Sequence, residues 1–304
     1  MSPLSPSDAS MDAHLNMRDD QSMPSGGAQA SPQTQPPSAQ PELPPDTANR
    51  FNGITRLIGR SSLECLQQSH VAVIGVGGVG SWAVEALARS GIGRLTLIDL
   101  DDVCVTNINR QLPALDGQIG RPKVEVLAER MHLINPRLEI NAIAAFVTPH
   151  NVDQYISDKF DHVIDAIDSI SAKTALVTAC VKMGIDITVT GGAGGLVDPT
   201  RIRRCDLAHT THDALLAKLR RNLRQEHGFP RNPKRKFKVT CITSDEARRY
   251  PSSDGTVSVN KPARGEPTRM DCTSGFGAAT FTTGSFGFAA AAHAVERLTR
   301  FAEA

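Results

Sequence analysis

The sequence lacks a paired Cys-x-x-Cys motif. Its 304 residues include six widely separated cysteines, which are Cys65, Cys104, Cys180, Cys205, Cys241 and Cys272. This spacing argues against the usual zinc sites, whose cysteine ligands come in close pairs. Scattered cysteines in a chain of this length are typical of a reducing compartment, so we expect a cytoplasmic protein.

The sequence also lacks a charge imbalance and a strongly hydrophobic membrane segment. Lys and Arg number 33 against 32 Asp and Glu, so a nucleic acid or an acidic membrane would have to be recognised by a local patch. The uncharged stretch 275–295 is long enough to span a bilayer, but it is rich in Gly, Thr, Ser and Ala and contains no Leu or Ile. We therefore expect a helix packed in the core, and no membrane span.

Large apolar residues are almost missing from residues 1–48, which are rich in Pro, Ser and Gln. Ordering a backbone costs about 1–2 kcal/mol per residue, and this segment has little apolar surface to bury in return. We predict a disordered tail. It has no apolar core of a signal peptide, and its aspartates and few arginines make it a poor transit peptide. Residues 49–304 are expected to form one domain.

A strand, a glycine turn, a helix and a second strand are predicted between His70 and Asp102. The apolar run 71–74 is followed by the pattern Gly75-x-Gly77-x-x-Gly80, and the run 95–100 carries Asp99. Glycines let the backbone approach a phosphate, a helix N-terminus attracts anions, and an acid after the second strand accepts hydrogen bonds from ribose. The alternative is a glycine turn that only packs the helix on the sheet.

Polar residues follow the later predicted strands. Asn107, Arg110 and Gln111 form a cluster beside the presumed phosphate site, and Lys123 opens a helix after Pro122. The strand at 161–169 ends in two acids, of which Asp168 either faces the ligand crevice or caps the next helix. Strands that alternate with helices predict an α/β fold: a Rossmann-like, mostly parallel sheet with helices on both faces. A basic insertion and a closing helix would complete the domain.

Residues 218–238 carry nine Lys or Arg against one Glu, with Phe229 and Phe237 interleaved. Such a run is either a solvated face or a contact for RNA phosphates. Cys272 precedes the closing helix, where a thiol can have a lowered pKa, although a buried inert cysteine is the simpler interpretation.

The segments GVGGVGSW, LIDLDDV, TNINRQ, GRPKVE and DAIDS resemble, in order and spacing over about 56–200, the ubiquitin-activating-enzyme-like ThiF/MoeB/HesA adenylating superfamily. Further segments, DDVCVTNINRQ, TGGAGG, YPSSDGTV and RMDCTSGFGAAT, resemble the bacterial tRNA threonylcarbamoyladenosine dehydratases from about residue 50 to the C-terminus. Only the tail falls outside this match.

The resemblance implies an ATP site and a catalytic set. ATP would lie over the glycine turn, with Asp99 on its ribose, and the implied nucleotide-binding residues are Gly75, Gly77, Gly78, Gly80, Asp99, Asp101, Asn107, Arg110, Lys123 and Asp168. Asn107, Arg110 and Lys123 would hold the phosphates and Asp168 would bind Mg²⁺, while Arg56 would reach the phosphates across a homodimer interface. The implied catalytic residues are Arg56, Arg110, Lys123 and Asp168.

The implied reaction is the ATP-dependent cyclisation, by loss of water, of threonylcarbamoyladenosine in tRNA, with residues 218–238 in contact with tRNA. A cysteine desulfurase or sulfur acceptor is an implied possible partner. Three alternatives stay open: an adenylating enzyme for a ubiquitin-like sulfur carrier, an NAD-dependent dehydrogenase, and a non-catalytic nucleotide- and RNA-binding protein. The lack of Cys-x-x-Cys pairs disfavours the first, and Arg110 and Lys123 are unexplained by the second.

Overall fold

The computed structural model describes residues 47–252, 254–260 and 276–299. The predictions of a disordered tail and of a role for Cys272 concern residues largely or wholly outside these ranges. The elements up to the third strand are α1 (Thr47–Arg50), α2 (Asn52–Ile58), α3 (Arg60–Gln68), β1 (His70–Ile74), α4 (Gly80–Arg89), β2 (Arg94–Ile98), α5 (Lys123–Ile134) and β3 (Glu139–Ile143). They are followed by α6 (Val152–Tyr155), β4 (His162–Asp165), α7 (Ile170–Met183), β5 (Asp186–Thr190), β6 (Ile202–Asp206), α8 (Ala214–Glu226), β7 (Thr240–Ser244), β8 (Tyr250–Pro251), β9 (Val257–Ser258) and α9 (Thr280–Thr299).

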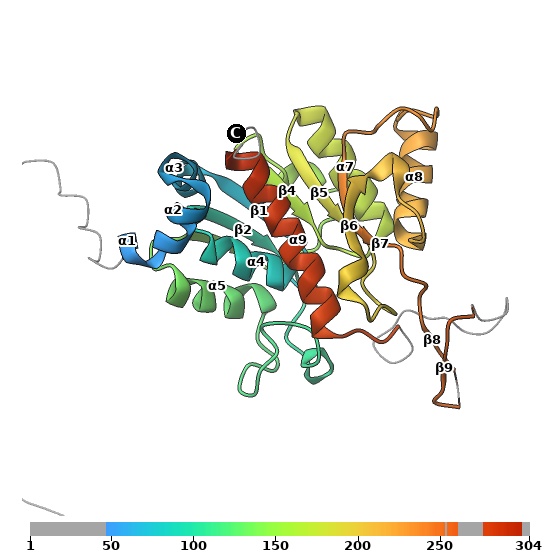
Figure 1. Cartoon of the computed structure of the whole chain (residues 1–304), viewed down its shortest axis with the longest axis horizontal. Helices are drawn as coiled ribbons and strands as arrows, with labels where there is room; N and C mark the ends of the chain where they lie inside the picture. Colours follow the sequence, from blue (N-terminus) through green and yellow to red (C-terminus); the bar gives the residue numbers. More distant parts are fainter. Residues whose placement is uncertain (1–46, 253, 261–275, 300–304) are drawn as a thin grey trace, which may run out of the picture. The chain divides into compact units, whose positions relative to one another are not determined.

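A seven-stranded sheet with the order β3-β2-β1-β4-β5-β7-β6 forms the centre of the domain (Figure 1). Its neighbours pair in parallel except β6, which runs antiparallel to β7. The chain winds outward from β1 to β3 and then returns to β4 on the other side of β1. This reversal of strand order between β1 and β4 is the place where sheets of this kind bind ligands, at the carboxyl ends of the strands.

Helices cover both faces of the sheet, because alternate residues of the buried strands point to opposite sides. In β1, Val71 and Val73 belong to the core beneath α4, α5 and α9, whereas Ala72 and Ile74 belong to the core beneath α7 and α8. The predicted α/β class, with a parallel sheet between two helical layers, is confirmed.

The uncharged stretch near the C-terminus forms α9, which crosses one face of the sheet beside α4 (Figure 1). A side chain at Gly287 would place its Cβ 2.5 Å from the carbonyl oxygen of Val79 and 2.8 Å from Cβ of Trp82. Glycine therefore allows the two helices to pack closely. Within the described ranges, no helix has both the length and the hydropathy needed to cross a bilayer.

Candidate active site

The glycine turn between β1 and α4 contains glycines of two kinds. At Gly80 an added Cβ would lie 1.8 Å from the carbonyl oxygen of Gly75, and at Gly75 it would lie 2.8 Å from Cγ2 of Ile167. Packing requires glycine at these two positions. At Gly77 and Gly78, however, the nearest atoms would be 3.6 and 3.4 Å away, so packing alone does not demand glycine there. Bare backbone at these two positions leaves room for a ligand, so packing accounts for Gly75 and Gly80 but not for Gly77 and Gly78.

Asp99 follows β2 and is hydrogen-bonded to the glycine turn. Its Oδ2 accepts a hydrogen bond from the backbone N–H of Val76 at 2.8 Å, and its Oδ1 accepts one from Asp101 at 2.9 Å. Burial raises the pKa of the Asp99 carboxyl, while these hydrogen bonds and the nearby Lys123 oppose the rise. Each carboxylate oxygen has a second acceptor position, so Asp99 can hold the turn and still accept from a ribose hydroxyl.

Lys123 begins α5 and points back toward the end of β2. Its ammonium nitrogen lies 2.8 Å from Oδ2 of Asp101, and its backbone N–H donates to the carbonyl of Asp101 at 3.1 Å. The lysine side chain is only 5 % exposed, whereas the Asp101 side chain is 54 % exposed. The geometry thus presents a nearly desolvated cation beside an aspartate that remains in contact with water.

The loop that follows β2 faces the glycine turn. Asn107 is buried, and its Oδ1 accepts from the backbone N–H of Cys104 at 3.2 Å. The guanidinium of Arg110 donates to the carbonyl of Thr106 at 2.8 Å, and Trp82 of α4 donates to the carbonyl of Arg110 at 3.0 Å. These bonds hold the backbone of the loop against α4 and place the Arg110 side chain beside Gly78, where an added Cβ would lie 3.6 Å from its Cγ.

Gln111 provides a test of whether a nucleotide fits this crevice. Its Oε1 is buried and has no hydrogen-bond partner among the described residues, and its amide is the group nearest to Gly77. A buried acceptor without a partner costs about 1–3 kcal/mol. A donor on a ligand above the glycine turn would satisfy it, so the residues present fit a bound nucleotide.

Asp168 lies at the reversal of strand order, directly after Ile167, whose side chain approaches Gly75. It is exposed, and it does not cap α7, because Ser169 occupies the N-cap position without a side-chain cap bond. An exposed carboxylate beside a phosphate site is a typical ligand for Mg²⁺, which takes one or two carboxylates together with substrate phosphates. The donor chemistry therefore fits this metal.

Sequence reasoning missed the support beneath Asp168. Asp165 and Lys173 form a fully buried ion pair, with Oδ1 and Nζ 2.9 Å apart. Burial raises the pKa of Asp165, and Lys173 opposes that rise. The same Oδ1 accepts the backbone N–H of Ile167 at 3.2 Å, so the pair shapes the turn that carries Asp168. A lysine among the mostly apolar residues of the helix after Asp168 was the available signal.

Arg56 lies apart from the other predicted residues within one chain. It is exposed on α2, which packs on α1 and α3. Phe51 and Leu63, at either side of this helix, lie next to Gly91, beyond the C-terminal end of α4. The glycine turn is at the other end of α4, whose ten residues span about 15 Å. The structure therefore brings together all predicted site residues except Arg56.

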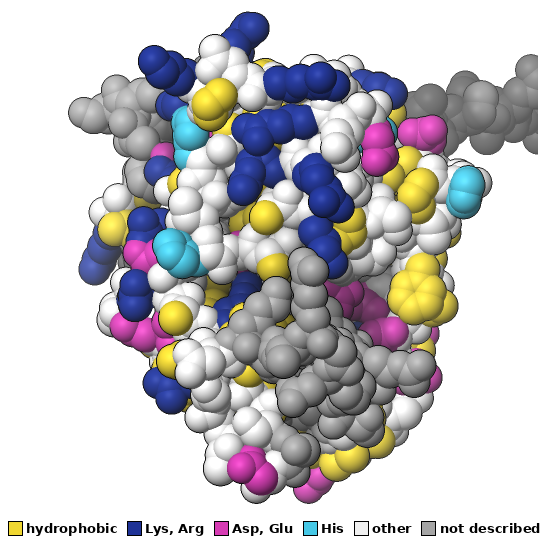
Figure 2. All heavy atoms as spheres, turned by 90° about the vertical axis from the view of Figure 1, so that its right-hand side faces the viewer, with side chains coloured by type: hydrophobic (Ala, Val, Ile, Leu, Met, Phe, Trp, Pro, Cys, Tyr) yellow, Lys and Arg dark blue, Asp and Glu magenta, His cyan; other side chains and the backbone are white. Residues whose placement is uncertain are grey.

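The basic run, residues 218–238, forms the later part of α8 and the segment that follows it. Leu216, Leu219 and Leu223 bury one face of α8. We call the exposed cations of residues 218–238 the basic surface: Lys218, Arg221, Arg231, Lys234, Arg235, Lys236 and Lys238. Figure 2 shows Lys and Arg gathered on this side of the molecule.

The two phenylalanines of the run do not serve as free stacking platforms. Phe237 is only 5 % exposed, and its ring centroid lies 5.1 Å from that of Phe229. Arg224 lies over the Phe237 ring and also donates to the carbonyl of Pro230 at 3.1 Å. The aromatic interleaving that suggested RNA contact is therefore a packing feature, and only the charges remain available to a partner.

The fold is that of a nucleotide-binding α/β protein, and Arg110 and Lys123 lie near its glycine turn and the end of β2. A family model described as the ThiF family matches residues 51–304, and the chain belongs to this family. It is 52 % identical over 249 residues to the tRNA threonylcarbamoyladenosine dehydratase of Escherichia coli, which covers 82 % of this chain and 93 % of that protein. The Bacillus subtilis protein of the same name is 46 % identical over 199 residues, 66 % of this chain and 76 % of that protein.

Solved structures agree with this assignment. A crystal structure of the E. coli tRNA N6-threonylcarbamoyladenosine dehydratase in complex with ATP superposes with a TM-score of 0.76 at 45 % identity, covering 86 % of this chain and 98 % of that chain. A complex of the same enzyme with AMP gives the same TM-score of 0.76. The resemblance inferred from the sequence motifs is confirmed.

Proposed function

We propose that this chain is an ATP-dependent tRNA threonylcarbamoyladenosine dehydratase. The observation that carries the proposal is the position of Arg110 beside Gly78 and of Lys123 beside Asp101 in a chain that shares 52 % identity with an enzyme of that name. The overall likeness to complexes with ATP and AMP supports ATP as the nucleotide.

The proposed chemistry is activation of a carboxylate followed by ring closure. A carboxylate is a poor electrophile because oxide is a poor leaving group, and transfer of AMP to the threonylcarbamoyl carboxylate, with release of pyrophosphate, provides a better one. The carbamoyl nitrogen then attacks the acyl carbon and AMP leaves, so that the net change in the nucleoside is the loss of one water. The nucleophile is tethered to its electrophile, which raises its effective concentration and lowers the barrier by several kcal/mol.

The protein must bring two anions together. Arg110 and Lys123 would offset the charge of the phosphates, Asn107 would shape their loop, and Asp99 would orient the ribose. Asp168 would hold Mg²⁺, which when bound supplies positive charge beside the phosphates. Preorganised donors of this kind act where charge develops, and loss of one typically costs about 10²–10³ in rate.

The basic surface is the proposed contact for tRNA. Its seven cations contrast with a net charge of +1 for the whole chain. Contacts from such side chains to phosphates release counterions, so affinity is expected to fall steeply with salt.

A homodimer is the proposed assembly, and α9 supports it. Phe281 and Phe288 are 55 % and 48 % exposed on one face of this helix, and Trp82 of α4 contacts Phe288 edge to face. A second copy covering this face would bury the rings. The approach of Arg56 of one protomer to the phosphates bound by the other is proposed from the family resemblance.

Three predictions concern the context of the enzyme. The cytoplasm, where ATP and tRNA are found, is the proposed location, and the free state of the five described cysteines agrees with a reducing compartment. Residues 49–304 are the proposed adenylating domain, with the tail outside it. The cysteine desulfurase or sulfur acceptor stays a prediction from the family resemblance.

Mass spectrometry of nucleosides tests the function. Bulk tRNA that carries threonylcarbamoyladenosine is incubated with the protein, ATP and Mg²⁺, and the nucleosides are then compared with a reaction without ATP. A product lighter by one water that requires ATP is the expected result. No mass change, with pyrophosphate release only after addition of a ubiquitin-like carrier protein, would assign the chain to the sulfur-carrier branch.

A further inference from the structure

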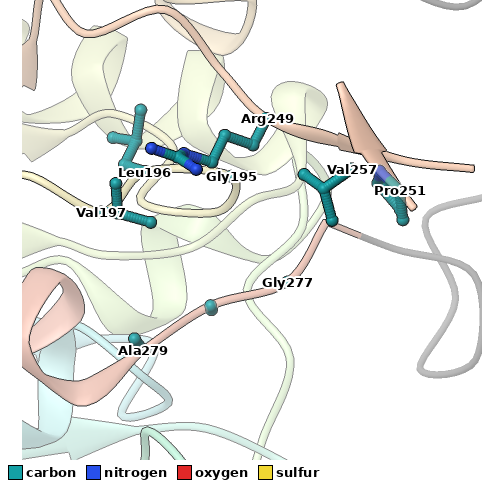
Figure 3. A pocket seen from close by; sticks show the side chains of 9 residues that line it. Gly195, Leu196, Val197, Arg249, Pro251, Val257, Gly277 and Ala279 are labelled. Atoms are coloured by element: carbon teal, nitrogen blue, oxygen red, sulfur yellow. The ribbon is translucent and has the colours of Figure 1, made fainter. Parts of the chain in front are cut away.

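The last residue of a second glycine-rich turn, which spans residues 191–195 after β5, forms with Leu196 and Val197 one wall of a pocket of about 250 Å³ (Figure 3). The opposite walls come from the β8–β9 hairpin and from the segment that leads into α9. Val197, Val257 and Ala279 give the pocket a mostly apolar lining, and the side chain of Arg249 extends beside Gly195. None of the roles proposed above uses this pocket.

The pocket walls are held in place by hydrogen bonds. The backbone N–H of Arg249 donates to the carbonyl of Gly195 at 2.8 Å, and the N–H of Gly195 donates to the carbonyl of Gly277 at 2.7 Å. The guanidinium of Arg248 donates to the carbonyls of Gly192 and Gly194 and contacts the buried carboxylate of Asp213. The turn is therefore preorganised, which lowers the entropic cost of binding a ligand.

One wall of the pocket is continuous with the phosphate-binding loop. The side-chain amide of Asn109 donates to the carbonyl of Ala278 at 2.7 Å, and the carbonyl of Asn109 accepts from both the N–H and the hydroxyl of Thr280. Arg110 is the next residue, and its guanidinium donates to Oδ1 of Asn109 at 3.0 Å. Asn109 therefore ties a wall of the pocket to the cation expected to bind the phosphates.

We propose that this pocket receives the adenine ring of the modified nucleoside in tRNA, with its threonylcarbamoyl group directed toward Arg110. This proposal rests on the proposed function. The volume is below the roughly 300–1,000 Å³ of sites that enclose a drug-sized ligand, and it suits a single base. Apolar walls accept a flat ring, and the exposed guanidinium of Arg249 offers a plane on which an unstacked base can stack.

Filling the pocket tests the proposal. Val197 is 39 % exposed and lines the pocket, so Val197→Phe introduces a ring into the space intended for the base. Val181→Phe is the matched control, because Val181 is 43 % exposed on α7 and does not line the pocket. Val197→Ala, which removes volume, is a second variant. Turnover of tRNA carrying threonylcarbamoyladenosine, affinity for ATP, affinity for unmodified tRNA and melting temperature are measured for each protein.

Val197→Phe is expected to lower kcat/KM for tRNA about 10- to 100-fold, the range for a misfit in an apolar pocket. Its affinities for ATP and for unmodified tRNA should equal those of Val181→Phe, and Val197→Ala should retain turnover. If the wild type does not dehydrate the nucleoside, the proposed function fails. If the wild type is active, two results overturn the pocket assignment. One is that Val197→Phe has the same turnover as Val181→Phe, and the other is that its affinity for unmodified tRNA falls by the same factor as its turnover.

Discussion

Replacing Lys123 by methionine separates the role of this cation in catalysis from its role in folding. Methionine retains an unbranched stem, so most of the packing around the buried side chain persists, while the positive charge is removed. The loss leaves Asp101 without its partner, but the Asp101 side chain is 54 % exposed and can be hydrated. A partly exposed ion pair contributes up to about 1 kcal/mol, so the free energy of unfolding should change little.

Turnover should change far more. If Lys123 offsets charge on the phosphates as it develops, its removal costs about 10²–10³ in rate, which corresponds to roughly 2.7–4 kcal/mol. The assay is the rate of cyclisation at saturating ATP and tRNA, with melting temperature measured on the same samples. Lys182→Met is the matched control, because Lys182 is an exposed lysine in the last turn of α7. A folded Lys123→Met protein with wild-type turnover would refute the reasoning.

Asp101→Asn distinguishes direct action of Lys123 from an indirect one. Lys123 could act by holding Asp101, since the two groups lie 2.8 Å apart. In that case both variants would lose turnover to the same extent. If instead the ammonium group contacts phosphate, Asp101→Asn should retain much more turnover than Lys123→Met.

Three further predictions follow from packing and charge. Gly80→Ala should strongly lower the melting temperature because its Cβ would lie 1.8 Å from the carbonyl oxygen of Gly75. Gly53→Ala, with nothing within 4 Å of its Cβ, is the control and should leave the melting temperature unchanged, so equal melting temperatures of the two variants would contradict this reasoning. Burial lowers the pKa of His162 to about 3 and of His293 to about 4, from an ordinary 6.5. The contribution of these two neutral histidines to the free energy of unfolding is therefore complete above pH 6.5 and declines as the pH falls toward 4. At pH 5 the free energy of unfolding, measured by urea denaturation, should be lower by about 2 kcal/mol per histidine. A free energy of unfolding that stays constant between pH 7 and 5 would show that these groups titrate normally. Replacing two cations of the basic surface by glutamine should weaken tRNA binding and lower the slope of log Kd against log salt concentration by the amount expected for about two phosphate contacts. An unchanged slope would exclude the surface as the tRNA contact.

Much of the candidate nucleotide site could be predicted because its signals are local. The glycine turn, the following helix and Asp99 lie within 33 consecutive residues, His70 to Asp102, and each depends on the conformation of its own segment. Pro122 likewise predicts the start of α5 and so the place of Lys123. The rule that parallel strands present their carboxyl ends at one edge then brings Asp168 to the same crevice.

Side chains whose meaning depends on a distant partner could not be assigned in this way. Phe237 in a basic run looks like a stacking platform, yet it is buried in the core because the run folds back on the sheet. Gln111 faces Gly77 only through tertiary packing. Arg248 pairs with Asp213 across 35 residues, and neither residue carries a local signal.

The sequence by itself therefore determined the α/β class, the glycine turn and the place of Lys123 at the start of a helix, because hydrophobic periodicity and backbone preferences act over a few residues. Only the tertiary structure decided which of the described atoms remain unpartnered, which side chains support the turn that carries Asp168, and where an apolar pocket opens next to the loop of Asn109. Those features arise from contacts between segments far apart in the chain, such as Asn109 with Ala278. Such contacts are selected by the packing of the whole domain, and no short segment encodes them alone.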